Sequence, residues 1–385
     1  MNESGGSNAL KNSTRIEGLD LIRAASIFMV VFEHVIEAVY TMHDVAFFNS
    51  LPEFKRHLLF FIFEFNRLSV PMFFYLTGYL LLTRDFDQTS AEKFYRRNFL
   101  SLFVTWEAWI VLYNVILAVL DRTEYREVIP AAADFVAKAQ PLQADVLLGN
   151  MIFIKGVDFV HAWYVGVILG IYLFIPVISR TLKIVSDREL FLLTAVAYIY
   201  YFIVPTANFF TERELMVWID VTFSGGMFGT YVILGYMIHR FEARLDALLD
   251  NRKIFFGVLA MVIGLTYAMA LVQLDFFNRG ELFLIWNNFC LLPPASVGLF
   301  LILKRVTRVR QLTADLSRCS FGIYLIHIPI LTVFLLFNPF GGLSSRGIKS
   351  AIWVSAIFAL SYLLTATLSK VPGIGKILFR VGRKR

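Results

Sequence analysis

The chain has 385 residues, of which 58% are hydrophobic and 17% are charged, and it contains 39 Phe. This composition lies far from soluble averages and predicts a protein embedded in a lipid bilayer. The net charge of +7 does not indicate a nucleic-acid partner, because the basic residues fall in short loops. Cys290 and Cys319 lie in or beside apolar segments, so no disulfide framework is expected.

The first apolar segment, Leu19 to Tyr40, follows a polar tail of residues 1–15 and is long enough to span a bilayer. No cleavable signal peptide is evident, so we expect this segment to remain as an anchor. It contains Arg23 and His34, which are eleven residues apart and therefore on one helical face, roughly 16 Å apart along the axis. Ionisable residues at this depth usually face a bundle interior or a water-filled cavity. The alternative is a snorkelling arginine and a structurally satisfied histidine.

About ten spans are expected in an all-α, polytopic bundle. They lie near residues 19–40, 58–82, 99–120, 160–179, 190–205, 221–239, 254–274, 281–303, 319–338 and 346–369. The fifth is short, and whether it crosses the membrane fully is left open. Most Lys and Arg residues fall in the segments that share a side with the N-terminus, so both termini are expected in the cytoplasm, with the protein in the inner (cytoplasmic) membrane.

The second span carries Glu64 and Arg67, three residues apart on one face, where they can neutralise each other. Pro71 removes a backbone donor and is expected to kink the helix. Taken alone, this pattern fits a packing kink with a structural ion pair. The loop that follows ends in Arg96 and Arg97, which suit phosphate binding, although ordinary positive-inside charge is the better explanation when the pair is taken alone.

The loop 121–159 is the one sizeable segment expected outside the membrane. Its apolar stretch 146–156 is too short to span, and we expect it to be interfacial or re-entrant and to cap a cavity on the outer face. His161 and Trp163 open the fourth span at that boundary, where aromatic residues are common. In the ninth span Tyr324 and His327 share a face, although a histidine there is more often a satisfied core residue. No Walker, Rossmann or zinc-ligand spacing occurs, and no metal is expected.

Five segments of the chain, in order, resemble acyltransferase family 3, a family of integral membrane acyltransferases. They read LDLIRAASIFMVVFEH, VPMFFYLTGYLL, FYRRNFLSLF, HAWYVGVILGIYLFIP and SFGIYLIHIP, and the resemblance covers residues 16–370. The chain departs from the family pattern at Leu21, Glu33, Thr77 and Leu100. On this resemblance residues 16–370 form a membrane acyltransferase domain, followed by a basic tail, 371–385.

The resemblance implies transfer of an acyl group, expected to be acetyl, from cytoplasmic acyl-CoA to a hydroxyl of a cell-envelope or exported glycan. The cations Arg23, Arg96 and Arg97 would bind the donor phosphates, and His34 would act as general base on the acceptor hydroxyl. The carboxylate that orients His34 is expected to be Glu37 or Glu64. The acceptor would contact a set of residues near the outer half of the bundle: Arg67, His161, Trp163, Tyr324 and His327.

Two rival interpretations stay open at this stage. One is a glycan transporter or flippase, which needs alternating access but no acyl donor. The other is an acyltransferase acting on a small molecule or a peptide. The sequence does not identify the acceptor, the acyl length or the oligomeric state.

Overall fold

The protein is an all-helical bundle, seen in a computed structural model that describes residues 17–40, 44–121, 143–153, 160–211, 225–281, 285–343 and 345–380. Most elements are α-helices, η1 and η3 are single π-helical turns, and η2 is a 3₁₀ turn. The elements are α1 (Glu17–Tyr40), α2 (Val45–Ser50), α3 (Glu53–Arg67), α4 (Ser69–Leu81), α5 (Gln88–Phe94), η1 (Tyr95–Phe99), α6 (Leu100–Asp121), α9 (Ala144–Met151), η2 (Val160–Ala162), α10 (Trp163–Ile184), α11 (Asp187–Tyr198), η3 (Ile199–Ile203), α12 (Val204–Thr211), α13 (Gly226–Arg240), α14 (Glu242–Leu249), α15 (Arg252–Asn278), α16 (Leu292–Lys304), α17 (Gln311–Phe337), α18 (Arg346–Leu368) and α19 (Ile374–Ile377).

Seven helical segments of the described chain are long and apolar enough to cross a membrane. They are Glu53–Leu81, Gln88–Val119, Trp163–Ile184, Asp187–Thr211, Arg252–Asn278, Gln311–Phe337 and Arg346–Leu368. With α1, which is 24 residues long but carries several charged side chains, the structure supports about seven to eight spans rather than ten. This makes the chain a polytopic membrane protein.

The lengths of three expected spans differ from the sequence prediction. The fifth is not short, because α11, η3 and α12 run without interruption over 25 residues, Asp187–Thr211. The sixth and eighth are the short ones. Helix α13 has 15 residues and α16 has 13, or about 22 and 20 Å of helix, against a hydrocarbon core of about 30 Å.

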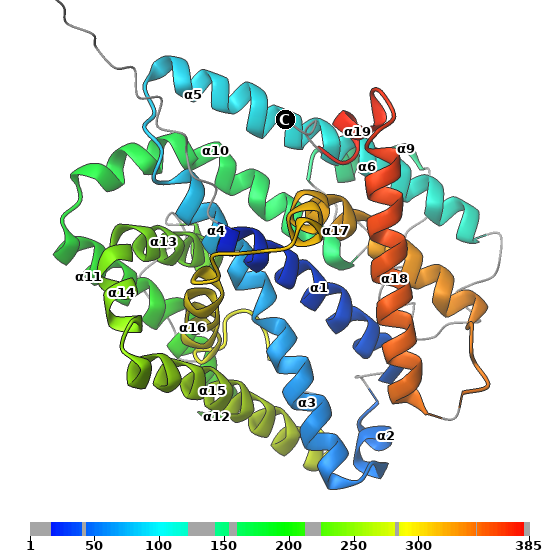
Figure 1. Ribbon diagram of the computed structural model, residues 1–385. Helices are drawn as coiled ribbons and strands as arrows, with labels where there is room; N and C mark the ends of the chain where they lie inside the picture. Colours follow the sequence, from blue (N-terminus) through cyan, green and yellow to red (C-terminus); the bar gives the residue numbers. More distant parts are fainter. Residues whose placement is uncertain are drawn as a thin grey trace, which may run out of the picture.

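Helix α1 lies at the centre of the bundle. It packs against α17, α4, α18, α16 and α3, and Figure 1 shows it running between α18 on one side and α3 and α16 on the other. Apolar residues on several faces of α1 are therefore buried, including Ile22, Ile27, Val31 and Val35. A helix that is enclosed in this way holds its polar side chains at fixed positions inside the protein.

Two glycines bring α4 and α13 into direct contact. A Cβ on Gly78 would lie 1.8 Å from the backbone oxygen of Val232, and one on Gly235 would lie 2.2 Å from that of Tyr75. Small residues of this kind let helices approach closely inside a bilayer, where no hydrophobic effect drives them together. Any larger side chain at either position would separate the two helices.

The second span is interrupted where the sequence predicts a kink. Helix α3 ends at Arg67, Leu68 forms the junction, and α4 begins at Ser69, so that Pro71 lies in the first turn of α4. Proline is tolerated in a first turn because its missing N–H has no helical partner there.

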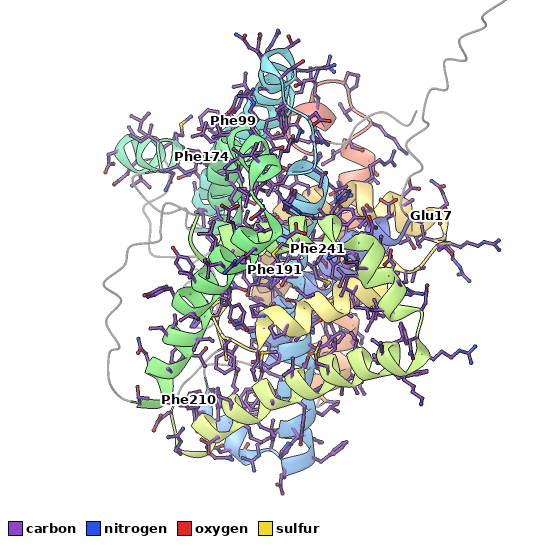
Figure 2. The ribbon with its side chains drawn as sticks, turned by 90° about the vertical axis from the view of Figure 1, so that its left-hand side faces the viewer. Glu17, Phe99, Phe174, Phe191, Phe210 and Phe241 are labelled. Carbon is purple, nitrogen blue, oxygen red and sulfur yellow. The ribbon has the colours of Figure 1, made fainter. Side chains whose placement is uncertain are left out.

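The outer surface of the bundle is rich in exposed phenylalanine. Phe174 on α10, Phe191 on α11 and Phe210 on α12 are each more than half exposed, and Figure 2 shows them along one side of the molecule. Aromatic area of this kind would be costly in water and is favoured against lipid chains. This face is therefore a lipid-facing surface.

The predicted loop 121–159 is described only in part, since residues 122–142 and 154–159 lie outside the described ranges. Within it, α9 packs against α6 and leaves Leu148, Ile152 and Phe153 exposed, which agrees with an interfacial position. The polar tail 1–15 and residues 381–385 also lie outside the described ranges. Helix α19, which lies within the expected tail 371–385, packs on α6 (Figure 1).

Candidate active site

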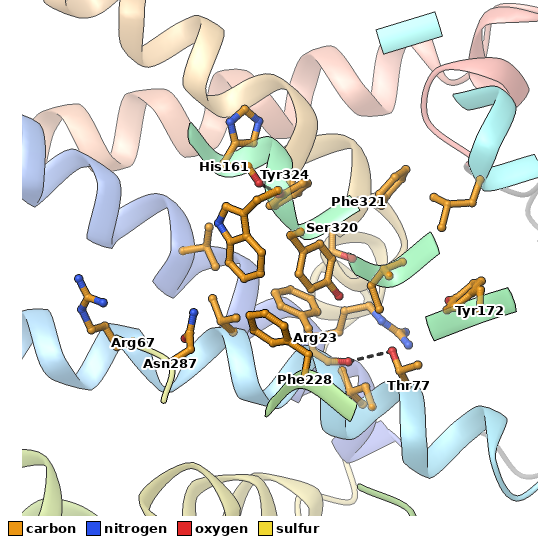
Figure 3. A pocket seen from close by; sticks show the side chains of 18 of the residues that line it. Arg23, Arg67, Thr77, His161, Tyr172, Phe228, Asn287, Ser320, Phe321 and Tyr324 are labelled. Carbon is orange, nitrogen blue, oxygen red and sulfur yellow. Dashed lines mark hydrogen bonds between the residues drawn. The ribbon is translucent and has the colours of Figure 1, made fainter. Parts of the chain in front are cut away.

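A cavity of about 970 Å³ lies in the bundle, lined mainly by α1, α4, α10 and α17. Figure 3 shows Arg67 and Asn287 on one side of it, Arg23 and Tyr172 on the other, and His161 and Tyr324 above. Of the residues predicted for the site, seven line this cavity: Arg23, His34, Glu37, Arg67, His161, Trp163 and Tyr324. The prediction that Arg23 and His34 share one face of a helix is therefore confirmed.

His34 is held by its own helix in a defined tautomer. Its Nδ1 lies 2.8 Å from the backbone oxygen of Val30. Because a carbonyl oxygen only accepts hydrogen bonds, Nδ1 of the neutral ring carries the hydrogen. The lone pair is then on Nε2, which is the atom that can accept a proton.

His327 lies behind His34 and is fully buried. Its Nδ1 is 2.7 Å from the backbone oxygen of Tyr324, so this nitrogen also carries a hydrogen. Its Nε2 is therefore an acceptor, and it lies 3.4 Å from Nδ1 of His34. His327 is not among the residues that line the cavity, so its contact with the site runs through His34.

His161 completes a group of three histidines, with its ring centroid 5.1 Å from that of His327. Tyr113 donates to the backbone oxygen of Leu325 at 2.7 Å, and its hydroxyl lies 3.2 Å from Nε2 of His161, which therefore donates to it. Tyr324 donates to the backbone oxygen of His161. These bonds join η2 to α6 and α17 close to His34 of α1.

Arg23 is positioned at the opposite end of the cavity by a polar pair on α1 and α17. Its Nη1 donates to Ser317 Oγ at 3.2 Å, and Ser317 donates to the carboxylate of Asp20 at 2.6 Å. Arg23 itself is 4.0 Å from Asp20. The guanidinium is thus oriented while part of it faces the cavity.

Arg67 forms its ion pair with a carboxylate of another helix, while Glu64 interacts with it only through its charge. Arg67 Nε lies 3.5 Å from Glu33 Oε1, with both side chains almost completely buried. Both oxygens of Glu64 are buried and have no hydrogen-bond partner among the described residues. Glu33 of α1 therefore fixes the position of Arg67 at this end of the cavity. The sequence had shown Glu33 only as a departure from the family pattern.

Aromatic side chains line part of the cavity wall. The rings of Trp163 and Phe228 stack with their centroids 5.1 Å apart, and the Arg67 guanidinium lies 5.7 Å from the ring centroid of Trp286. Trp163 is 40% exposed and Trp286 57% exposed, so both are accessible to a ligand. Trp286 carries no periodicity or motif that would have identified it from the sequence.

Arg96 and Arg97 lie on η1, are exposed, and are not among the lining residues. Instead, Arg84 and Arg380 line the cavity together with Arg23. Neither residue was predicted to bind a ligand, and residues 371–385 were expected only to form a basic tail. No pattern in one sequence indicates that residue 380 returns to the bundle.

The arrangement can perform a proton transfer between two ligands. A cation lies at one end of the cavity, an aromatic wall with an ion pair lies at the other, and a basic imidazole nitrogen belongs to the helix between them. Glu37 also lines the cavity, one turn after His34. Within the described residues no group of His, Cys, Asp or Glu is arranged to hold a metal ion.

Comparison with known proteins gives one match. A family model described as an acyltransferase domain, of the acyltransferase 3 type, matches residues 16–370. No curated protein and no solved structure matches the chain.

Proposed function

The chain belongs to acyltransferase family 3 and is a membrane acyltransferase, and we propose that it transfers an acetyl group from cytoplasmic acetyl-CoA to a hydroxyl of a cell-envelope or exported glycan. The observation that carries this proposal is the single cavity that Arg23, His34 and Trp163 share. One ligand can enter at the cationic end and another at the aromatic end, and both can reach His34.

Acyl-CoA fits the cationic end by charge and by shape. Its phosphates are suited to guanidinium groups, which bind phosphate through two parallel hydrogen bonds. We propose that Arg23 binds one of them and that Arg96 and Arg97, exposed beside the mouth, bind the outer part of the nucleotide. The slim pantetheine arm then extends along α1 for part of the roughly 16 Å between Arg23 and His34.

The proposed chemistry is direct transfer with His34 as general base. His34 Nε2 accepts the proton of the acceptor hydroxyl while the hydroxyl oxygen attacks the thioester carbonyl. The tetrahedral intermediate then breaks its carbon–sulfur bond, and the CoA thiolate takes the proton back from His34. One ester and one free thiol are formed, with no net change in charge.

The group around His34 prepares it for this role. His327 and the Val30 carbonyl hold Nδ1, which leaves Nε2 as the basic atom. Glu37 and Glu64 were the carboxylates predicted to orient the ring. We propose that Glu37, which lines the cavity as Glu64 does not, stabilises the imidazolium that forms when Nε2 accepts a proton.

The acceptor is proposed to lie against the aromatic wall. Sugar rings present C–H faces that pack on indole rings, and Trp163 and Trp286 are both exposed at this end. Arg67, His161 and Tyr324 supply polar groups that can bind hydroxyls. The basic loops favour an orientation in which this end faces away from the cytoplasm.

The test is acyl transfer by the purified protein. Labelled acetyl-CoA is supplied together with glycan fractions from the cell envelope, and free CoA thiol and labelled glycan are measured. The proposal expects both products in equal amount. Thiol release with only a small alcohol or a peptide would move the acceptor to another class. Glycan transport without thiol release would instead support a transporter.

A further inference from the structure

We infer that the C-terminal segment 374–380 is part of the acyl-donor site and that Arg380, together with Arg84, binds the phosphates of the donor. This inference rests on the proposed use of acyl-CoA. Arg380 lies ten residues beyond the matched domain, in a segment that the sequence indicated only as a basic tail. The structure brings it to the cavity wall.

The segment is anchored to the bundle by specific contacts. Trp109 Nε1 donates to the backbone oxygen of Leu378 at 2.7 Å. The side chain of Phe379 is 2% exposed, with its ring centroid 6.0 Å from that of Trp109. It also fills the space beside Gly322, where a Cβ would lie 2.8 Å from the Phe379 ring. These contacts fix the position of the residue that follows.

Arg380 is a half-buried cation that lines the cavity, and no described carboxylate pairs with it. It donates to the backbone oxygen of Asn98 at 3.2 Å, and no ion pair involves it within the described ranges. Burial lowers the pKa of Arg380, but a guanidinium remains charged at any working pH. Keeping a desolvated positive charge is costly unless an anion binds to it.

The backbone at this position is also strained. Arg380 has a φ of +51°, a left-handed conformation that residues with a side chain rarely adopt. Such strain persists where the surroundings impose it, often at ligand sites. At this position the side chain of Arg380 donates to Asn98 and lines the cavity.

Arg84 supplies a second cation at the same end. It follows α4, its Nε donates to the backbone oxygen of Leu80 at 3.1 Å, and no described carboxylate pairs with it. Arg84, Arg380 and Arg23 therefore come from three separate parts of the chain and converge on one cavity. Asn98, the partner of Arg380, belongs to η1, so the exposed Arg96 and Arg97 are close in sequence to this contact.

Acyl-CoA is a ligand that needs several cations, because it carries a diphosphate and a 3′-phosphate. Each charge-assisted hydrogen bond to a phosphate contributes about 1.5–3 kcal/mol, or roughly a 10-fold to 100-fold change in affinity. A donor without phosphates, such as acetyl-pantetheine, gains nothing from Arg84 or Arg380. This difference separates phosphate binding from a general effect on the site.

The experiment compares Arg380→Gln, Arg84→Gln and the parent with acetyl-CoA, acetyl-dephospho-CoA and acetyl-pantetheine. We expect KM for acetyl-CoA to rise at least 10-fold in each variant, with kcat at saturation and KM for acetyl-pantetheine unchanged. Arg380→Lys should restore part of the affinity. The matched control is Lys376→Gln, an exposed cation of the same segment, which should leave all values unchanged.

Two further measurements keep the result interpretable. Arg84→Gln loses only a contact within its own helix end, so it tests the inference even if Arg380→Gln is unstable. Calorimetric titration of each variant with CoA tests binding without turnover. If the parent binds CoA but does not transfer acyl groups, the proposed function fails while the inference is still decided by these titrations. An unchanged CoA affinity in both variants, or an equal loss for acetyl-pantetheine, would overturn the inference.

Discussion

His34 and His327 lie in contact, with Nδ1 of His34 3.4 Å from Nε2 of His327 and the ring centroids 5.2 Å apart. The backbone oxygens of Val30 and Tyr324 give both rings the same tautomer. We therefore propose that His327 acts on the site through the orientation of His34, as a positioning residue behind the proposed general base.

We predict that His327→Leu lowers kcat by about 10-fold to 100-fold with little change in KM, which is the usual size of such supporting effects. His327→Gln should retain more activity, because its amide oxygen can accept from His34. The pH profile of kcat should shift in the leucine variant, which a purely structural role would not cause. His239→Gln, on α13, is the matched control. Equal kcat in the leucine variant and the parent would show that the contact has no function.

The pair between Glu33 and Arg67 is predicted to stabilise the fold. Arg67→Met removes the cation beside two buried carboxylates, Glu33 and Glu64, and should cost about 3 kcal/mol of unfolding free energy. Adding Glu33→Gln to Arg67→Met should recover part of this loss. Thermal unfolding in detergent measures both. The exposed ion pair between Arg279 and Asp275 offers a control, because Arg279→Met should cost less than about 1 kcal/mol of unfolding free energy. If Arg67→Met and Arg279→Met lose the same unfolding free energy, the buried pair does not stabilise the fold more than a surface pair does.

Arg23→Ala is predicted to weaken CoA binding by roughly 10-fold to 100-fold, because an oriented phosphate partner is lost. Arg23→Lys should recover part of it, since an ammonium lacks the planar fork of a guanidinium. The double variant Arg96→Gln, Arg97→Gln should also bind CoA more weakly. Calorimetry with CoA provides the measurement, and Arg188→Gln, an exposed cation elsewhere, provides the control. If these variants bind CoA as tightly as the parent does, the three cations do not bind the donor and serve only to orient the protein in the membrane.

Trp286→Ala should raise KM for the acceptor by about 5-fold to 10-fold, the range expected for the loss of one aromatic contact. KM for acetyl-CoA should not change, because Trp286 lies at the end of the cavity near Arg67. Phe174→Ala, which removes an exposed ring from the lipid-facing surface, should alter neither value. If Trp286→Ala raises KM for acetyl-CoA and leaves KM for the acceptor unchanged, the acceptor does not bind at Trp286.

The sequence predicted the parts of the fold that follow from local periodicity. The face shared by Arg23 and His34 depends only on helical geometry, and the interruption near Pro71 depends only on proline chemistry. Span lengths were less accurate, because apolar residues at 281–291 resemble a helix although residues 285–291 form turns before α16. Hydropathy does not distinguish an apolar turn inside the protein from a helix.

The residues that the sequence missed are those brought together by the tertiary structure. Glu33 and Arg67 belong to different helices, and no spacing rule predicts their contact. Arg380 reaches the cavity only because Phe379 is buried beside Trp109 and Gly322. Pairings of this kind depend on how the helices are packed, and a single sequence carries no record of it.

The central claim is that His34 transfers a proton while an acyl group passes from a cytoplasmic donor to an acceptor reached from the other side. It is tested in sealed vesicles of known orientation, with labelled acetyl-CoA on one face and glycan on the other. We expect labelled glycan only when acetyl-CoA is on the Arg23 side, and a loss of at least about 100-fold in His34→Ala, which should keep the melting temperature of the parent. Near-parent transfer by His34→Ala, or transfer regardless of the face supplied with acetyl-CoA, would contradict it.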